Sequence, residues 1–115
     1  TATPAVLELK DVFFDYDRFV LRDDAREALT GNGKLLVDNP GAQVLLEGHC
    51  DERGTVEYNL ALGERRAGAV KGYLVQYGVD ASLLRTISYG EERPFAPGQD
   101  EAAWSQNRRV HFVKQ

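Results

Sequence analysis

Residues 42–78 read AQVLLEGHCDERGTVEYNLALGERRAGAVKGYLVQYG, and their pattern decides the fold. The apolar run at 44–46 has no polar break, which is typical of a strand in the interior of a sheet. Further along, apolar side chains recur on one helical stripe: Leu60, Ala67, Val70, Leu74 and Tyr77. The glycine that follows is a common helix stop. The stretch therefore predicts a buried strand over residues 42–48, a loop, and a helix that continues through Tyr77.

The sequence on either side adds three strands and a second long helix. Asp24 followed by Glu27 has the form of a capping box, with the aspartate as the cap. The helix that follows should end at residues 39–41, Asn-Pro-Gly, because proline cannot continue it. The other strands are expected at residues 6–16, 84–89 and 108–114, with one helical turn over residues 101–104.

The predicted order is β-α-β-α-β-loop-β. Two crossover helices that join strands imply some parallel pairing. We expect an α/β (α+β) two-layer sandwich, in which a mixed four-stranded sheet carries both helices on one face. Residues 1–6 are expected to end an N-terminal linker, and residues 7–115 to form one domain. Ligands bind such sheets beyond the carboxyl ends of the strands, which here precede the loops at 14–22 and 49–58.

Composition narrows the class of protein. The chain has 115 residues, of which 43% are apolar and 28% charged, as in an ordinary globular domain. The net charge of −4 disfavours a nucleic-acid partner, because proteins that bind nucleic acid are usually basic. No apolar run approaches the roughly 18 residues that span a bilayer. The single cysteine cannot form an intrachain disulfide.

The run His49-Cys50-Asp51-Glu52 raises the question of a metal or catalytic site. Neighbouring side chains at a strand end point to opposite faces, so His49 and Cys50 cannot easily bind one ion together. Zinc requires three or four converging ligands, and the other histidine, His111, lies on a different strand. A Cys50–His111 dyad would need an oxyanion hole that the local sequence does not supply. We expect no metal, no cofactor and no enzymatic activity, with His49 and Cys50 structural.

The remaining interpretation is that the charged side chains form a surface or a binding site that does not catalyse a reaction. The acids and arginines of residues 51–66 could form a solvated, salt-bridged surface, as most such clusters do. Alternatively, Asp51 could accept the ammonium of a zwitterion while Arg66 holds its carboxylate with a planar fork. If the helix began at Gly54, Arg66 would lie about 18 Å along it, too far for one small ligand. The two-residue site therefore predicts a helix that begins near Asn59.

Two segments of the sequence resemble a known family. GHCDERGTVEYNLALGERRA and SYGEERPFAPGQDEAAWSQNRRV are similar to the OmpA-like peptidoglycan-binding domains, and the likeness covers the chain from about Leu7 to Val113. It implies a βαβαββ fold and noncovalent binding of the meso-diaminopimelate side chain of peptidoglycan. The residues that match the family's ligand site are Asp51, Arg66, Phe14, Asp15, Tyr16, Arg53 and Leu62. We expect the NRRV segment at 107–110 to be structural.

The segments DERGTVEYNLALGERRA and DEAAWSQNRRV resemble the lipoprotein branch of that family more than its OmpA or MotB branches. This implies a periplasmic protein, anchored in the outer membrane by an acylated cysteine upstream of Thr1, that tethers the membrane to the cell wall. It also implies TolB and other Tol proteins as partners, with a role in cell division. A TolB-docking domain without wall binding, a flagellar MotB-type or OmpA-type anchor, and a wall hydrolase stay open as alternatives. Cys50 departs from the alanine or threonine more usual in the family.

Overall fold

The computed structural model describes residues 8–115. The predicted linker, residues 1–6, lies outside the described part. The elements follow in the order β1 (Val12–Phe13), α1 (Asp23–Asp38), β2 (Val44–His49), α2 (Val56–Tyr77), a 3₁₀ turn (Ala81–Leu83), β3 (Leu84–Gly90), α3 (Glu101–Asn107) and β4 (Arg109–Lys114). No helix in this range combines the length and apolar character needed to cross a membrane.

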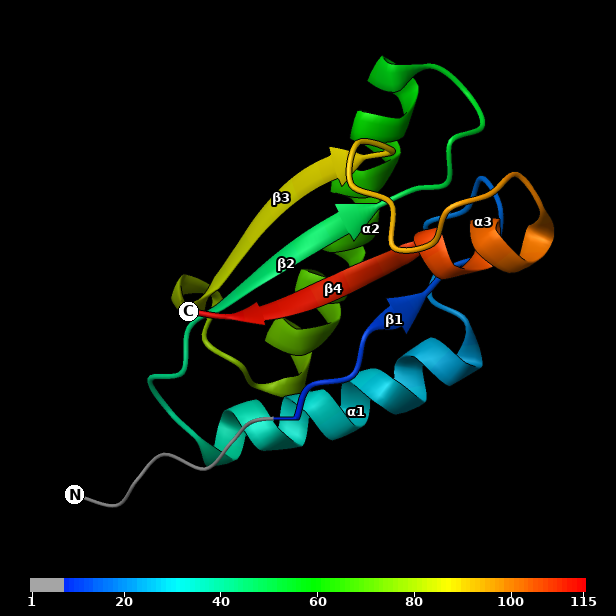
Figure 1. The fold of residues 1–115 in the computed structure, drawn as a ribbon. Helices are drawn as coiled ribbons and strands as arrows, with labels where there is room; N and C mark the ends of the chain where they lie inside the picture. Colours follow the sequence, from blue (N-terminus) through cyan, green and yellow to red (C-terminus); the bar gives the residue numbers. More distant parts are fainter. Residues whose placement is uncertain (1–7) are drawn as a thin grey trace.

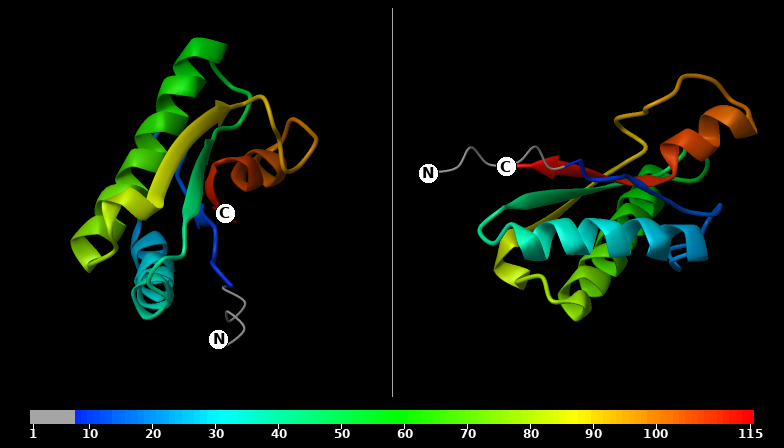
Figure 2. Two further views of the ribbon diagram at one scale, coloured as in Figure 1. Left: turned by 90° about the vertical axis from the view of Figure 1, so that its left-hand side faces the viewer. Right: turned by 90° about the horizontal axis from the view of Figure 1, so that it is seen from below.

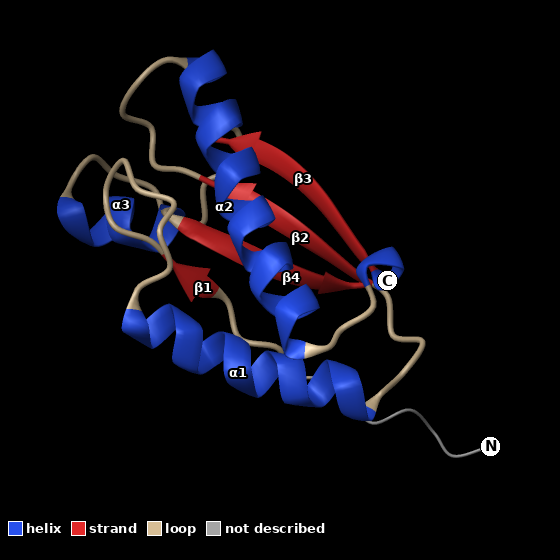
Figure 3. Ribbon diagram, turned by 180° about the vertical axis from the view of Figure 1, so that it is seen from behind, coloured by secondary structure: helices blue, strands red, loops and turns tan. Residues whose placement is uncertain are grey.

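The four strands form one mixed sheet in the order β1-β4-β2-β3. Strands β2 and β3 are parallel, while β4 is antiparallel to both β1 and β2. Helices α1 and α2 cover the same face of the sheet, as the view from behind shows (Figure 3). The predicted two-layer α/β sandwich is confirmed.

The core lies between that face and the two helices. Val44 and Leu46 of β2 are fully buried, and Val70 and Leu74 of α2 are fully buried beneath them. Each strand residue alternates with a neighbour on the open face, so the VLL run is buried on the helix side and only half-buried on the other. Burial of this apolar face is the main source of stability for a domain of this size.

One backbone contact sets how closely α2 approaches β2. A Cβ atom added to Gly48 would lie 1.8 Å from the carbonyl oxygen of Gly63, so any side chain there would have to force the two elements apart. A Cβ atom added to Gly63 would lie 2.2 Å from the Ser88 hydroxyl. The middle of α2 is therefore pressed against the end of β2 and the neighbouring β3.

Both long helices begin where the sequence did not predict. Helix α1 starts at Asp23 with Arg22 as its N-cap, because the Asp24 carboxylate accepts hydrogen bonds from Arg22 and does not cap the helix. Helix α2 starts at Val56, where the Thr55 side chain accepts a hydrogen bond from the Tyr58 backbone at 3.1 Å.

The first strand and the third helix also differ in length. Pairing in β1 stops after Phe13, because residues 15–18 turn tightly and Asp17 adopts a positive φ of 55°. Helix α3 has seven residues where one turn was expected, and the Asp100 side chain caps it by accepting from the Ala103 backbone at 2.9 Å.

The carboxyl ends of β1, β2 and β3 meet at one end of the sheet. Figure 1 shows their three arrowheads pointing to the end where α3 lies, and β4 running the opposite way. The two further views show α3 beyond the sheet, away from the layer formed by α1 and α2 (Figure 2). The loops that were expected to carry a site are therefore brought together at this end.

Candidate functional site

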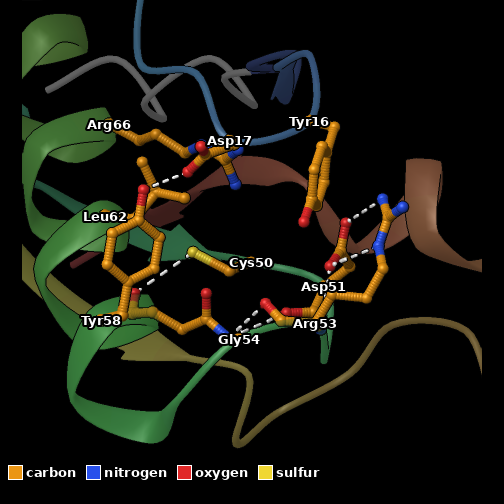
Figure 4. A pocket seen from close by; sticks show the side chains of 10 residues that line it. Tyr16, Asp17, Cys50, Asp51, Arg53, Gly54, Tyr58, Leu62 and Arg66 are labelled. Carbon is orange, nitrogen blue, oxygen red and sulfur yellow. Dashed lines mark hydrogen bonds and ion pairs between the residues drawn. The ribbon is translucent and has the colours of Figure 1, made fainter.

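A hollow of about 110 Å³ opens between the loop after β1, the loop after β2 and the first turns of α2. Its walls are formed by Tyr16, Asp17, Cys50, Asp51, Arg53, Gly54, Tyr58, Asn59, Leu62 and Arg66. Figure 4 shows Asp51 and Arg53 on one side, facing Tyr58, Leu62 and Arg66 from α2 on the other. The hollow is small and combines a carboxylate with cationic and apolar walls.

Asp51 supplies a buried carboxylate, with 4% of its surface exposed. Burial alone would raise the pKa of this group, but hydrogen bonds from Arg53 outweigh burial and hold the pKa below its ordinary value. The Arg53 Nη2 atom lies 2.8 Å from Asp51 Oδ2, and the Arg53 backbone N–H donates to Oδ1 at 3.0 Å. Asp51 is therefore ionised at neutral pH and can attract a cation.

Arg66 is a cation that is 99% buried, since its exposed fraction is 1%. Its Nε donates to the carbonyl oxygen of Arg18 at 2.8 Å, and its Nη2 to that of Asp15 at 3.0 Å. Its Nη1 donates to the carbonyl oxygen of His49 at 2.9 Å. Burial lowers the pKa of Arg66, yet an arginine stays charged at neutral pH. Because a guanidinium has five N–H donors, two remain for a ligand.

The prediction that α2 must begin near Asn59 for Asp51 and Arg66 to share a site is wrong. The helix begins earlier, at Val56, and both residues still line the same hollow. The reason is that Asp51 does not lie at the helix start. The Gly48–Gly63 contact places the end of β2 beside the middle of α2, and Asp51 and Arg66 each follow their contact glycine by three residues.

Arg53 forms one edge of the hollow and links it to α3. Its guanidinium lies between two aromatic rings, 3.8 Å from the centre of Tyr16 and 4.0 Å from that of Trp104. Such stacking stabilises a planar cation. The Trp104 indole N–H in turn donates to the Glu52 carboxylate at 3.0 Å. Helix α3 thus supports the acidic side of the hollow from outside.

The rim is aromatic and ties the two loops together. Tyr16 and Tyr58 are about half exposed, and the Tyr58 hydroxyl donates a short hydrogen bond to Asp17. That bond raises the pKa of Tyr58. It joins the loop after β1 to the first turn of α2 at the rim of the hollow (Figure 4).

Five of the seven predicted ligand residues line the hollow, namely Tyr16, Asp51, Arg53, Leu62 and Arg66. Phe14 and Asp15 do not. Phe14 is buried, and the Arg66 guanidinium lies over its ring, with Cζ 5.2 Å from the ring centre. The Asp15 side chain points to solvent, where it pairs with Arg22, while the Asp15 carbonyl holds Arg66. Both residues position the arginine and do not form the walls.

His49 and Cys50 are buried, as expected of structural residues. His49 packs edge-on against Phe95 with ring centres 4.8 Å apart, and burial lowers its pKa. The Cys50 thiol donates to the Asn59 carbonyl at 3.2 Å, and burial raises its pKa to about 11. Throughout residues 8–115, no three His, Cys, Asp or Glu side chains converge where they could hold a metal ion.

The sequence did not indicate that α3 and the NRRV segment reach the site. Arg108 is buried and places its Nη1 3.5 Å from Asp51 Oδ2. Its Nη2 lies 2.7 Å from Glu101, and its Nε donates to the Phe14 carbonyl. Asn107 has the structural role expected of it, since its side chain holds the backbone of Ala96. Arg108 combines that structural role with an ion pair to Asp51.

The fold and the hollow define a class of small α/β-sandwich domain that carries a buried carboxylate and a buried guanidinium at the carboxyl ends of its strands. The sequence model of the OmpA family matches residues 13–108. The chain belongs to the OmpA family.

Two relatives of this chain share one name. The chain is 53% identical, over 86% of its length, to the peptidoglycan-associated lipoprotein of Haemophilus influenzae. It is 51% identical, over 96% of its length, to the protein of that name in Pseudomonas aeruginosa. It spans 65% of the length of each of these relatives.

Solved structures agree in fold. The peptidoglycan-associated lipoprotein of Burkholderia pseudomallei superposes with a TM-score of 0.88 at 43% identity, covering 91% of this chain and 89% of that one. The C-terminal domain of Helicobacter pylori MotB superposes with a TM-score of 0.85 at 23% identity, covering 92% and 84%. The MotB likeness shows the shared fold alone.

Proposed function

We propose that this domain binds, and does not cleave, the zwitterionic head of a diaminopimelate residue in the stem peptides of peptidoglycan. One observation carries the proposal: a buried carboxylate and a buried guanidinium, Asp51 and Arg66, line the same small hollow. An amino-acid head group carries an ammonium and a carboxylate on one carbon, so it matches this pair in charge. The names of the relatives associate those proteins with peptidoglycan.

Each residue then has a defined task. Asp51 accepts the ammonium, and Arg66 donates its two remaining N–H groups to the carboxylate. Phe14 and Asp15 fix the orientation of Arg66, and Leu62 and Tyr16 contact the aliphatic part of the ligand. A lysine side chain has the ammonium without the second carboxylate, so it cannot use Arg66. Two features support binding over cleavage. The Asp51 carboxylate accepts hydrogen bonds from Arg53, and Cys50, the potential nucleophile beside it, is a buried thiol with a raised pKa.

The wider role extends from this binding. We infer that the protein is a periplasmic lipoprotein that tethers the outer membrane to the cell wall, contributes to envelope integrity and cell division, and docks to TolB and other Tol proteins. The thiol that carries the lipid cannot be Cys50, because that side chain is buried and hydrogen-bonded inside the domain.

The test is a calorimetric titration with a stem peptide that contains diaminopimelate, against a matched peptide that contains lysine. Asp51→Asn removes the charge that holds the ammonium and should weaken binding about ten- to a hundredfold. Asp38→Asn is the matched control, because Asp38 is an exposed acid at the end of α1. Equal affinity for the two peptides would contradict the proposed contact between Arg66 and the second carboxylate of the ligand. TolB binding with no binding of isolated sacculi would favour a docking domain instead.

A further inference from the structure

We propose that Arg53 occupies the ammonium position at Asp51 while the site is empty, and that ligand binding transfers its guanidinium to Glu101. The inference rests on the proposed function, because it concerns how the same hollow admits its ligand. It assigns Arg53 a competing role instead of a direct contact, and it gives the exposed Glu101 a part in binding.

The first step is the acceptor capacity of Asp51. A carboxylate offers about four acceptor positions. Oδ1 accepts from the Arg53 backbone N–H at 3.0 Å and from Arg53 Nε at 3.2 Å. Oδ2 accepts from Arg53 Nη2 at 2.8 Å, and Arg108 Nη1 faces it at 3.5 Å. Arg53 thus supplies all three hydrogen bonds to the carboxylate, and Arg108 Nη1 faces Oδ2 without a hydrogen bond, so an incoming ammonium competes with Arg53 for Asp51.

The second step identifies which group leaves. The Arg108 side chain is 7% exposed and is fixed by the Phe14 carbonyl at 2.9 Å and by Glu101 at 2.7 Å. The Arg53 backbone N–H belongs to the loop and cannot withdraw alone. The Arg53 side chain is 28% exposed and lies at the edge of the hollow, where Figure 4 shows its guanidinium beside the carboxylate. Arg53 is therefore the group that the ammonium displaces.

The third step is where the guanidinium goes. Arg53 Nη2 already lies 4.0 Å from Glu101 Oε2, at the limit of an ion pair. The rings of Tyr16 and Trp104 hold the guanidinium on both faces, so it can slide between them and keep both stacking contacts. The Glu101 side chain is 68% exposed, and while its Oε1 pairs with Arg108 at 2.7 Å, its Oε2 is the atom that faces Arg53. The transfer exchanges one carboxylate for another, which limits its cost to the difference between the two pairs.

Two variants follow from this exchange. Arg53→Gln keeps a long side chain between the rings and removes the competing charge, so we expect the diaminopimelate peptide to bind about tenfold tighter, equivalent to one charge-assisted hydrogen bond. Glu101→Gln removes the group that receives the guanidinium and should weaken binding by up to about fivefold, the range of an exposed ion pair. Once Arg53 is replaced, the effect of Glu101→Gln should shrink to what its ion pair with Arg108 contributes.

The experiment is a double-mutant cycle measured by calorimetric titration of the diaminopimelate peptide. Arg65→Gln is the matched control for net charge, since Arg65 is exposed on α2 and its only described partner is the Phe19 ring at 5.7 Å. Arg53→Lys keeps a charge without the planar fork and should fall between the wild type and Arg53→Gln. Urea unfolding of every variant establishes that each is folded at the assay temperature.

The outcomes separate the two proposals. If the wild type and every variant fail to bind the peptide, the proposed function is wrong. If the wild type binds and Arg53→Gln binds as tightly or less tightly than Arg65→Gln, the competition is overturned and Arg53 is a direct contact or has no role. If Glu101→Gln weakens binding equally in both backgrounds, the transfer to Glu101 is overturned. Tighter binding by Arg53→Gln, with a smaller effect of Glu101→Gln in that background, supports the inference.

Discussion

Replacing Arg66 with methionine should destabilise the fold as well as abolish binding, because the arginine donates hydrogen bonds to three backbone carbonyls, two in the loop after β1 and one at the end of β2. Methionine keeps most of the aliphatic volume and loses every donor. The carbonyls of Asp15 and Arg18 lie in the exposed loop after β1 and can turn to water. The carbonyl of His49 is buried at the end of β2 and cannot.

The magnitude follows from these three partners. One buried carbonyl left without a donor costs about 1–3 kcal/mol. Release of the loop after β1 from Arg66 adds about 1 kcal/mol for each solvated hydrogen bond that is lost. Removing a buried charge that had lost its hydration returns part of this cost. We expect the free energy of unfolding to fall by about 2–4 kcal/mol in total, which is a large share of the roughly 5–15 kcal/mol of a typical domain.

The assay is urea unfolding followed by circular dichroism, with Arg65→Met as the matched control. Arg65 is adjacent in sequence and exposed, so its replacement should change the free energy of unfolding by no more than about 0.5 kcal/mol. A loss below about 1 kcal/mol for Arg66→Met, at an unchanged slope against urea, would refute the idea that Arg66 holds the two loops.

Three further predictions concern other parts of the site and its scaffold. The folded-state pKa of Asp51 is lowered, so the contribution of its charge to stability is complete above about pH 4 and is lost as the pH falls through that folded-state pKa. In urea titrations, the difference in unfolding free energy between wild type and Asp51→Asn should therefore be smaller at about pH 3 than at pH 6, and a constant difference would contradict the lowered pKa. In thermal unfolding, Gly48→Ala should lower the stability by at least about 3 kcal/mol, because the added Cβ would lie 1.8 Å from the Gly63 carbonyl oxygen. Gly72→Ala, whose Cβ meets nothing within 4 Å, should stabilise α2 by about 0.5–1 kcal/mol, and similar effects of the two changes would rule out the close approach of Gly48 to Gly63. Burial raises the pKa of Cys50 to about 11, so at about pH 8 its thiol should react with a disulfide reagent some two orders of magnitude more slowly in the native protein than in urea. Equal labelling rates in the two conditions would contradict the raised pKa.

The layers of the fold could be predicted from hydrophobic patterns because each long element carries its own period. The VLL run and the stripe through Leu74 were sufficient to place β2 and α2 in one core. Ends were less predictable, since they depend on which polar partner a side chain finds. Asp24 has the form of a cap in sequence, but Arg22 takes its carboxylate.

The candidate site could be predicted from the sequence only in part, for a similar reason. Asp51 and Arg66 could be paired by charge and by family resemblance, although the geometry used to justify the pairing was wrong. What brings them together is a contact between two glycines, which carry no side-chain signal. Arg108 and Trp104 come from a segment about fifty residues away, and local sequence gives no sign that α3 folds back onto the loop after β2.

The glycine contact has a consequence for protein engineering. Because Gly48 and Gly63 touch through backbone atoms, the spacing of β2 and α2 does not depend on which side chains surround the hollow. The loops at 15–22 and 51–55 supply half of the wall residues, and the second of them joins β2 directly to α2. A library that varies these loops outside Asp51, with both glycines kept, would change the walls of the hollow on an unchanged scaffold, so the domain is a starting point for engineered small-molecule receptors.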